Sequence, residues 1–556
     1  MLNAAVIGVL GAAWFYLMYR WYGGVIDRRL IRPNDDRPTP ANTRRDNVDF
    51  VPSRPAILFG HHFSSIAGAG PIVGPMFAYF LFGWLPALIW ILLGSVFAGA
   101  VHDYTSMMSS VRSGGVSIAE IAQRHVSQAA RWIFTVFLWL ALVLVIAVFA
   151  VLTAQTLAEK PEIVIPTIGL MLLAMAFGSL VYRGSVNLVL GTAAALVLML
   201  GLIILGDFYP ISASFDFWLV FSLVYSLVAA TLPVWLLLQP RDYISMYILL
   251  VGLILGFGSL LVLRPEISGP AFVGFSSSNG PLWPILFITV ACGAVSGFHS
   301  VVSSGTSAKQ LRRETDGKII AFGGMLTEGI LALLVLLLMA GVLTWDRPGA
   351  AGEGFVFRTL LAEQGANITF GAAMGRALEA IGIPLVYGTA FGILMLNAFI
   401  LTTLDTCARL TRFIVTESLG QKIPLFRNRF LATIPGLAFA FVLTIGNNWK
   451  ILWPAFGAAN QLIAALALLV VTAYLFGYKR RTRYTLIPGV FMLATTEGAL
   501  FYQLFWLYLP TGNIILGVVA ALLMVLGVVV AVEVYRRLRR SDQVVPAEGQ
   551  LAAEQA

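Results

Sequence analysis

Residues 60–75 of the chain read GHHFSSIAGAGPIVGP, a polar and glycine-rich stretch inside a long apolar region. Glycine and proline interrupt helices, and an interrupted backbone survives in a bilayer only when it is buried in protein or lines a wet cavity. The free N–H groups at such a break attract anions, and its free carbonyls hold cations. We therefore predict a binding site at an interrupted membrane helix. A kinked helix with close glycine packing is the structural alternative, but it leaves the two histidines and two serines unexplained.

The composition of the whole chain is that of a membrane protein. Of its 556 residues, 59% are hydrophobic and 11% are charged, whereas soluble proteins carry about 45–50% apolar and about 25% charged residues. Apolar runs repeatedly reach the roughly 20 residues that span a bilayer core. The sequence therefore predicts an all-α polytopic membrane protein of about 15 transmembrane helices. The expected spans are 3–22, 58–80, 83–108, 131–156, 163–181, 186–206, 216–238, 243–263, 281–304, 319–344, 384–406, 430–446, 450–476, 485–507 and 513–535.

Basic residues follow the positive-inside rule along this map. If the N-terminus lies outside, all but six of the 36 Lys and Arg fall on the inner side. The residues left on the outer side are Lys160, Arg264, Arg347, Arg358, Arg376 and Lys450. The pattern predicts an outward N-terminus and an inward C-terminus. It attributes the net charge of +9 to orientation and anionic lipid rather than to nucleic acid.

Polar side chains recur inside other spans. His102 and Asp103 lie near the inner end of the span 83–108, where an interfacial cap is the alternative to a functional role. In the span 281–304, one helical face carries, at i, i+3, i+4 and i+7, Ser296, His299, Ser300 and Ser303. A serine stripe can simply permit close helix packing. The ionisable histidine on the same face favours a lined pathway.

Carboxyl groups also fall in apolar surroundings. Glu328 and Glu497 are each either a proton relay or a buried structural carboxyl. Asp405 and Arg409 stand four residues apart, and this spacing predicts a local ion pair. The two cysteines lack metal-ligand spacing, so no metal site is expected.

Four stretches together resemble the carbon starvation protein (CstA) family of bacterial inner-membrane transporters. They are GHHFSSIAGAGPIVGP (60–75), GAVHDYTSMMSSVRSGG (99–115), GAVSGFHSVVSSGTSAKQ (293–310) and LTTLDTCARLTRF (401–413). The resemblance implies a secondary transporter that imports a small carbon source across the cytoplasmic membrane during starvation. Members are associated with peptides in one branch and with pyruvate and proton symport in another, and the quoted motifs do not decide between these branches.

The family is placed near the amino-acid/polyamine/organocation transporters, whose core is five helices plus an inverted five. This implies a transport core at 58–406 with halves 58–206 and 216–406, and the sequence AATLPVWLLLQP (229–240) supplies the expected break in the second half. The other parts are an N-terminal helix and cytoplasmic linker at 1–57, C-terminal transmembrane helices at 407–540 and a disordered tail at 541–556. By this analogy the second and seventh spans hold the substrate, the fourth and ninth line it, and a cation site lies between the second and the ninth.

The expected site residues follow from these patterns and from the resemblance. The expected substrate-binding residues are His61, His62, Ser64, Ser65, Gly68, Gly70, Ser296, His299 and Ser300. The expected ion- or proton-coupling residues are Ser303, Ser304, His102, Asp103, Glu328 and Asp405. The coupling ion is either a proton carried by histidine or sodium held by carbonyls around Ala67–Gly70 with the hydroxyls of Ser303 and Ser304. No other cofactor, no nucleic acid and no enzymatic reaction are expected; the partners are a small carboxylate or peptide and the lipid bilayer.

Two other classes of protein stay open. A membrane nutrient sensor without transport is one, although no fused signalling domain is visible. A haem-containing oxidoreductase with intramembrane histidine ligands is another, but the adjacent His61 and His62 cannot both face one haem from a helix. ATP-driven pumping is disfavoured because no G-x-x-x-x-G-K-[ST] loop occurs.

Overall fold

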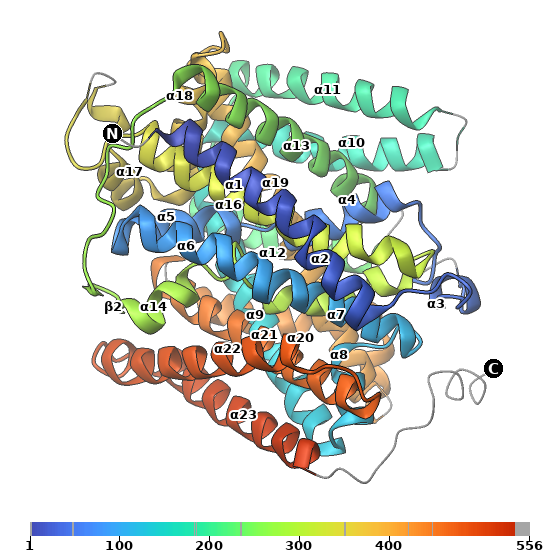
Figure 1. Cartoon of the computed structure of the whole chain (residues 1–556). Helices are drawn as coiled ribbons and strands as arrows, with labels where there is room; N and C mark the ends of the chain where they lie inside the picture. Colours follow the sequence, from blue (N-terminus) through green and yellow to red (C-terminus); the bar gives the residue numbers. More distant parts are fainter. Residues whose placement is uncertain are drawn as a thin grey trace.

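Long apolar runs without β-type alternation give a chain that is helical almost throughout (Figure 1). The computed structural model describes residues 3–46, 49–182, 184, 186–233, 236–349, 352–420, 422–446 and 449–539, so the expected disordered tail at 541–556 lies outside the described residues. Within these residues the strands form one two-stranded antiparallel ribbon, β1 (Ser276–Ser277) with β2 (Gly280–Pro281).

Each of the fifteen predicted spans coincides with a helix or with a pair of helices. The uninterrupted helices are α1 (Ala4–Arg20), α9 (Gln128–Glu159), α10 (Val164–Tyr182), α11 (Leu188–Phe208), α12 (Phe215–Thr231), α13 (Leu238–Leu263), α16 (Gly323–Gly341), α19 (Leu385–Leu419), α20 (Arg429–Thr444), α21 (Trp449–Gly477), α22 (Arg483–Tyr502) and α23 (Ile514–Arg539). Among the described residues, 12 helical stretches are long and apolar enough to cross a membrane, and α12 and α20 are shorter. The count of fifteen crossings therefore stays a prediction.

Short helices join or flank the long ones. They are α2 (Tyr22–Val25), η1 (Ile26–Ile31), α3 (Pro40–Thr43), α8 (Ile118–His125), η3 (Pro161–Ile163), η4 (Ser307–Lys309), η5 (Glu314–Asp316), η6 (Lys318–Phe322), η7 (Glu353–Phe355), α17 (Phe357–Glu363), α18 (Gly365–Glu379), η8 (Pro424–Arg427) and η9 (Gln503–Tyr508). The Ser117 hydroxyl caps the surface helix α8 by accepting from the Glu120 N–H at 3.3 Å, as an S-x-x-E sequence predicts.

Two spans are interrupted. The first consists of α4 (Pro55–Ile66) and α5 (Gly70–Phe82), which confirms the predicted interrupted helix. The second consists of α14 (Leu282–Thr289) and α15 (Gly297–Gly305). The span that follows the first in sequence, α6 (Trp84–Gly94) and α7 (Ala100–Arg112), continues through the π turn η2 (Ser95–Gly99).

The second interruption does not lie where the sequence placed it. The stretch AATLPVWLLLQP joins two separate helices, since α12 ends at Thr231 and α13 begins at Leu238, with Pro233 between them and Pro240 in the first turn of α13. The unwound residues are 290–296, which contain no proline. They stay unwound because other helices satisfy the freed backbone groups: the Ser95 hydroxyl donates to the Gly293 carbonyl at 3.0 Å, and the Asn460 side chain accepts from the Phe298 N–H at 2.9 Å.

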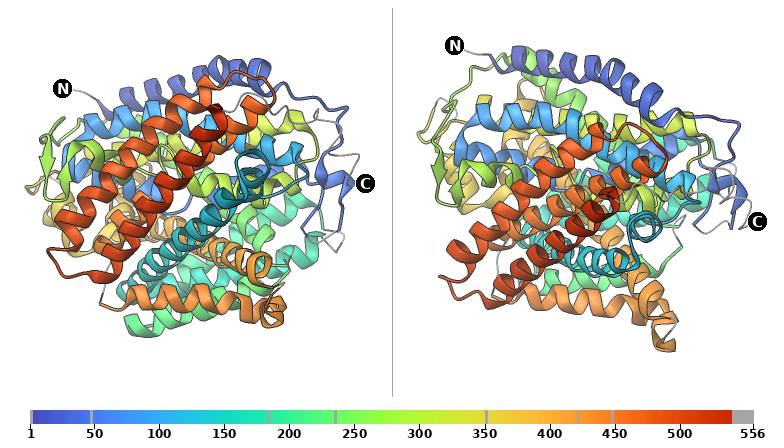
Figure 2. Two further views of the ribbon diagram at one scale, coloured as in Figure 1. Left: turned by 90° about the horizontal axis from the view of Figure 1, so that it is seen from below. Right: turned by 60° about the horizontal axis from the view of Figure 1, so that its bottom comes forward.

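The interrupted spans lie in the middle of the bundle. The long helices α9 and α19 pack against each other, α4 packs on α13, and α15 packs on α21. The hairpin α10–α11 forms one edge and the pair α22–α23 the opposite edge, with α1 lying along α16 (Figure 1). Views from below show α22 and α23 side by side on the outside of the bundle (Figure 2).

Apolar side chains face outward on the edge helices. On α11, Val189 is 74% exposed and Leu190 is 69% exposed, as expected of a surface that lipid covers. The polar side chains of the spans are instead buried inside the bundle, where they meet one another.

Candidate functional site

The first break is held open by close contacts with neighbouring helices. A side-chain Cβ added at Gly68 would lie 2.7 Å from the Thr403 hydroxyl and 3.1 Å from the Phe149 ring. One added at Gly70 would overlap the Cys292 side chain. Only glycine allows such an approach of backbone to side chains. The requirement for glycine at these two positions thus has a structural reason.

The two breaks touch each other. Cys292, which faces Gly70, belongs to the unwound residues of the second interrupted span. The Asn460 amide donates to the Cys292 sulfur at 3.1 Å and to the Ser296 hydroxyl at 3.0 Å. Asn460 on α21 therefore fixes the second break against the first. Nothing in the sequence around Asn460 indicates this role, because the partners come from distant helices.

Four of the predicted polar residues meet in one buried row. His102 Nδ1 lies 2.8 Å from the Asp103 carboxylate on α7, and His299 Nδ1 on α15 lies 2.9 Å from the other Asp103 oxygen. His299 Nε2 lies 3.2 Å from Glu328 on α16. All four side chains are fully buried. The structure thus brings His102, Asp103, His299 and Glu328 together, although they are far apart in sequence.

This row can hold and pass a proton. An ionised Asp103 accepts hydrogen bonds from both Nδ1 atoms, so these protons are assigned to Nδ1 of His102 and His299. His299 Nε2 then faces the Glu328 carboxyl, and one proton placed between them satisfies both groups. Chains of buried histidine and carboxyl groups are typical of proton relays in membrane transporters.

A second buried network lies around Arg241. His61 Nδ1 is 2.9 Å from Asp242, whose other oxygen is 3.3 Å from Arg241. Arg241 also forms an ion pair with Asp405 on α19, and the Tyr225 hydroxyl on α12 donates to Asp405 at 2.8 Å. One arginine thus compensates two carboxylates, and α4, α12, α13 and α19 meet at these five side chains. The Ser64 hydroxyl adds a bond of 2.7 Å to the Asp242 carbonyl.

The sequence analysis missed Arg241 and Asp242. Their signal was present, because an Arg-Asp pair inside an apolar span is a functional candidate by default. The predicted local pair of Asp405 with Arg409 is wrong. Asp405 binds Arg241, while Arg409 donates to the carbonyls of Ala229, at 3.1 Å, and Leu232 at the end of α12. These carbonyls have no partner within their own helix, so they attract the guanidinium.

The remaining predicted residues are dispersed. His62 Nδ1 lies 2.9 Å from the Ser307 hydroxyl, and the buried hydroxyls of Ser65 and Ser303 have no hydrogen-bond partner among the described residues. The Ser300 hydroxyl donates to the Gly297 carbonyl at 2.7 Å on its own helix.

Ser304 lies at the far end of α15. Its hydroxyl donates to the Ser300 carbonyl at 2.7 Å and accepts from the Ile118 N–H of α8 at 3.1 Å. The atoms nearest a Cβ at Gly68 belong to Thr403 and Phe149, not to the serines of α15. The hydroxyl beside the broken backbone is therefore that of Thr403, which the sequence analysis did not single out.

Comparison with known proteins shows similarity to the carbon starvation proteins along most of the chain. The model of the family described as "Carbon starvation protein CstA" matches residues 3–348 and 349–499. The chain is 32% identical to a protein of Bacillus subtilis (strain 168) named "Peptide transporter CstA", over 96% of this chain and 97% of that one. It is 32% identical to the "Pyruvate/proton symporter BtsT" of Escherichia coli (strain K12), over 91% of this chain and 82% of the relative.

The identity and coverage are similar for a second relative from Escherichia coli. The chain is 34% identical to the "Peptide transporter CstA" of Escherichia coli (strain K12), over 89% of this chain and 80% of that one. Among solved structures, a manganese transporter of Eremococcus coleocola matches with a TM-score of 0.49 and 11% identity, over 89% of this chain and 99% of that one. From the family match and these relatives, the chain belongs to the carbon starvation protein CstA family and is a transporter of that family.

Proposed function

We propose that this transporter is a proton symporter that imports a small carboxylate-bearing solute, pyruvate or a short peptide, across the bacterial cytoplasmic membrane during starvation. The observation that carries the proposal is the contact between two helix breaks beside a fully buried histidine–carboxylate row. The names of the relatives support both cargo classes, since they include peptide transporters and a pyruvate/proton symporter. The proposal assigns no chemical reaction to the chain.

A carboxylate suits the geometry of the breaks. The helices α5 and α15 both begin at a break, at Gly70 and Gly297. The N-terminal ends of helices carry partial positive charge and free N–H groups, which stabilise a bound anion. Pyruvate and peptides both carry a carboxylate, and it is this group that we place between the breaks.

The proton is the favoured coupling ion because the buried ionisable groups are histidines and carboxyls in contact. Sodium stays the alternative, with backbone carbonyls of the first break and the Thr403 hydroxyl as oxygen ligands. In a symport cycle the row of His102, Asp103, His299 and Glu328 takes up a proton from the outer side and gives it up on the inner side.

The two structural halves of the core are proposed to be 55–263 and 282–477, in place of 58–206 and 216–406. Three features support this division. Each proposed half begins with an interrupted span, α4–α5 or α14–α15. The packing of α4 on α13 corresponds to that of α14 on α21, and the packing of α9 on α20 corresponds to that of α19 on α12. The hairpin α10–α11 is then an insertion in the first half.

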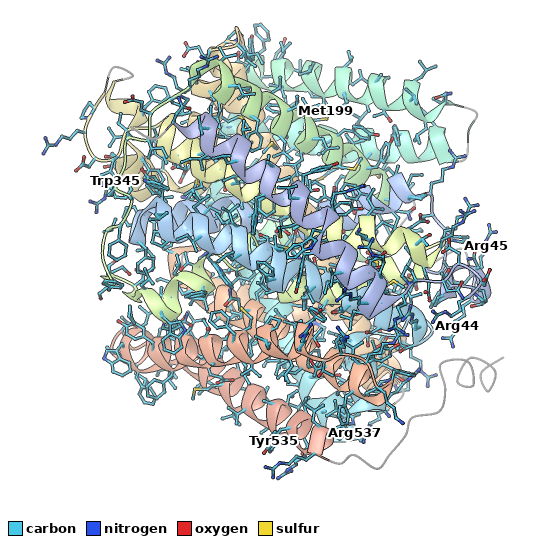
Figure 3. All side chains as sticks on the ribbon, viewed as in Figure 1. Arg44, Arg45, Met199, Trp345, Tyr535 and Arg537 are labelled. Atoms are coloured by element: carbon cyan, nitrogen blue, oxygen red, sulfur yellow. The ribbon has the colours of Figure 1, made fainter. Side chains whose placement is uncertain are left out.

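The orientation is a proposal that labelling can test. Arg44, Arg45 and Arg537 lie toward one end of the molecule and Trp345 at the other (Figure 3), and by the positive-inside rule the arginine-rich end is cytoplasmic. The native cysteines Cys292 and Cys407 are buried, so a maleimide should react with an introduced exposed cysteine rather than with these two. In cells, Glu363→Cys should react with a membrane-impermeant maleimide, and Arg313→Cys only after the membrane is made permeable. Labelling of both positions in intact cells would contradict the orientation.

Uptake by purified protein in liposomes tests the function directly. Radiolabelled pyruvate and trialanine are supplied under an inward proton gradient or an inward sodium gradient, each imposed separately. We expect accumulation of one cargo above its equilibrium level under the proton gradient alone. Accumulation that requires sodium, or no uptake of either cargo, contradicts the proposal.

The substitution His299→Gln separates proton coupling from cargo movement. Glutamine keeps a side-chain donor, but it cannot hold the proton between His299 and Glu328. In the wild type an inward proton gradient should accelerate cargo uptake. In the variant we expect this acceleration to be at least tenfold smaller, while exchange of cargo across the membrane continues. Ser303→Ala on the same helix is the control, and it should behave as the wild type. If Thr403→Val removes a sodium dependence while His299→Gln is unaffected, the coupling ion is sodium.

A further inference from the structure

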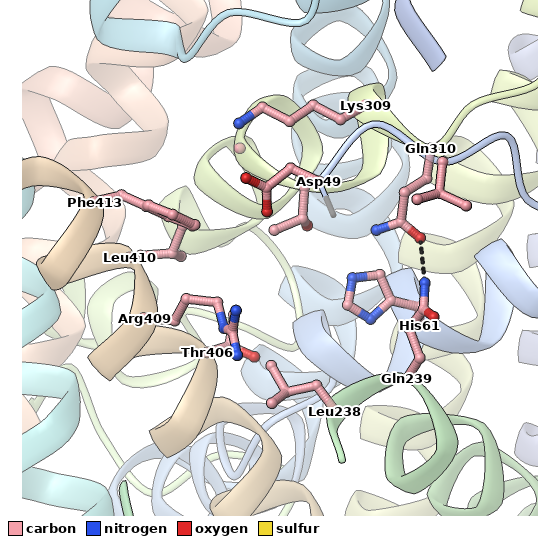
Figure 4. Close-up of a pocket in the computed structure, with 13 residues that line it drawn as sticks. Asp49, His61, Leu238, Gln239, Lys309, Gln310, Thr406, Arg409, Leu410 and Phe413 are labelled. Carbon is pink, nitrogen blue, oxygen red and sulfur yellow. Dashed lines mark hydrogen bonds between the residues drawn. The ribbon is translucent and has the colours of Figure 1, made fainter. Parts of the chain in front are cut away.

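A narrow polar cavity of about 30 Å³ reaches His61 between the N-terminal linker, α4, α13 and α19 (Figure 4). This volume holds a carboxylate group or a few water molecules, since one water needs roughly 10–15 Å³ on such a measure. The polar side chains that line it include Asp49, Gln239, Lys309, Thr406 and Arg409. The cavity is separate from the two helix breaks, because neither the residues of the breaks nor their glycines line it.

Three polar groups of the cavity wall lack partners. His61 Nε2, the Thr406 hydroxyl and Arg409 Nε have no hydrogen-bond partner in the described part of the chain. Their residues are only 2%, 2% and 5% exposed, respectively. Buried polar groups are nearly always paired, and leaving one unpaired is costly. Arg409 Nε–H is a donor and the Thr406 hydroxyl can donate, so an acceptor such as a carboxylate suits both.

The charges around His61 balance when its ring is neutral. The cations are Arg241 on α13, Lys309 on η4 and Arg409 on α19; the anions are Asp49 in the linker, Asp242 on α13 and Asp405 on α19. Other ionisable groups on the elements packed against α4 include Tyr243 and Tyr247 on α13, Arg412 and Glu417 on α19, Lys318 on η6, His299 on α15 and Glu328 on α16. Relative to the three cations and three anions named above, a carboxylate entering the cavity adds one uncompensated negative charge.

The hydrogen bond to Asp242 decides which atom of His61 faces the cavity. Its carboxylate lies 2.9 Å from Nδ1 and accepts the Nδ1 proton, so a neutral ring presents the bare lone pair of Nε2. This lone pair repels a carboxylate. Protonation turns Nε2 into a donor and supplies the compensating charge, so the anion and the proton stabilise each other's binding.

We propose that His61, Thr406 and Arg409 form an inner site at which the carboxylate of the cargo and one proton bind together before release to the cytoplasm. The inference rests on the proposed transport function and adds a site that is distinct from the helix breaks. On release, the cargo leaves as an anion, and the His61 Nε2–H bond gives its proton to water in the cavity.

Binding of radiolabelled pyruvate, or of trialanine if pyruvate is not bound, to the full chain in lipid nanodiscs tests the site. In the wild type we expect affinity to fall with rising pH, by up to about tenfold per pH unit, because one proton binds with each carboxylate. His61→Gln places an amide donor at the same position, so its affinity should change less than twofold per pH unit. Arg409→Gln should bind the cargo at least tenfold more weakly, since a charged hydrogen bond is lost. Its affinity should change with pH as steeply as that of the wild type, because His61 is still present.

Two further variants make the test independent of folding defects. Thr406→Val has nearly the same shape and should weaken binding severalfold with an unchanged slope. His125→Gln is the control: this buried histidine of α8 lies outside the site, and burial together with Arg124 and Arg537 lowers its pKa to about 4, so it stays neutral throughout. A wild-type slope and affinity in His61→Gln, or wild-type binding by Arg409→Gln and Thr406→Val, overturns the inner site alone. Failure of the wild type to bind either cargo contradicts both the inner site and the proposed function.

Discussion

Replacement of Arg241 by methionine is expected to lower the free energy of unfolding by about 3–5 kcal/mol, the cost of removing one partner from a buried ion pair. Arg241 is 1% exposed and is the cation between Asp242 and Asp405. Without it, two carboxylates stay buried at the junction of four helices, and His61 contacts only one of them, Asp242. SDS titration in lipid–detergent micelles, followed by tryptophan fluorescence, measures the loss.

The same helix provides the control for this experiment. Arg264 directly follows α13 and its side chain is exposed, so Arg264→Met should change the free energy of unfolding by less than about 0.5 kcal/mol. In the double variant Arg241→Met with Asp405→Asn, one of the unpaired charges disappears, and we expect recovery of part of the lost stability. Equal stability of the Arg241 and Arg264 variants would show that Arg241 does not stabilise the fold by compensating the charges of Asp242 and Asp405.

The substitution Gly70→Leu is expected to abolish transport while the protein still inserts into the membrane. A Cβ at this position already overlaps the Cys292 side chain, so leucine forces the two breaks apart. Because we place the cargo carboxylate between the breaks, their separation should reduce uptake to the level of empty liposomes. Initial rates of uptake, normalised to the amount of inserted protein, measure the effect.

Gly201→Leu is the matched control for this substitution. Gly201 lies on α11, and a Cβ there meets no atom within 4 Å. Its replacement should leave uptake unchanged, which separates a general effect of glycine-to-leucine replacement from an effect at the breaks. Normal transport by Gly70→Leu would mean that the glycines of the first break serve helix packing only.

The helices and the first break were predictable because their signals are local. Apolar runs of bilayer length give the positions of the helices. Glycine and proline mark the first break directly in the sequence, and Gly68 and Gly70 prove to be close-approach positions. The histidines and carboxyls of the buried row were also found individually, because ionisable groups in apolar spans stand out.

The parts of the site that the sequence did not reveal depend on partners from other helices. The second break contains no proline and is kept unwound by Ser95 and Asn460, which lie far away in sequence. The i,i+4 spacing of Asp405 and Arg409 predicted a pair, but such spacing carries no information about Arg241, which approaches from α13. Contacts between helices that are distant in sequence therefore determine both the position of the second break and the partner of Asp405.

The most direct test of proton symport is the cargo gradient at which net flux reverses in liposomes held at zero membrane potential. If one proton moves with each cargo molecule, an inward gradient of one pH unit supplies about 1.36 kcal/mol. It then balances a roughly tenfold outward cargo gradient, which costs nearly the same free energy. We expect net flux of the transported cargo to stop at this tenfold ratio and to reverse beyond it. A reversal point that stays at equal cargo concentrations, whatever the pH difference, would contradict coupling to protons.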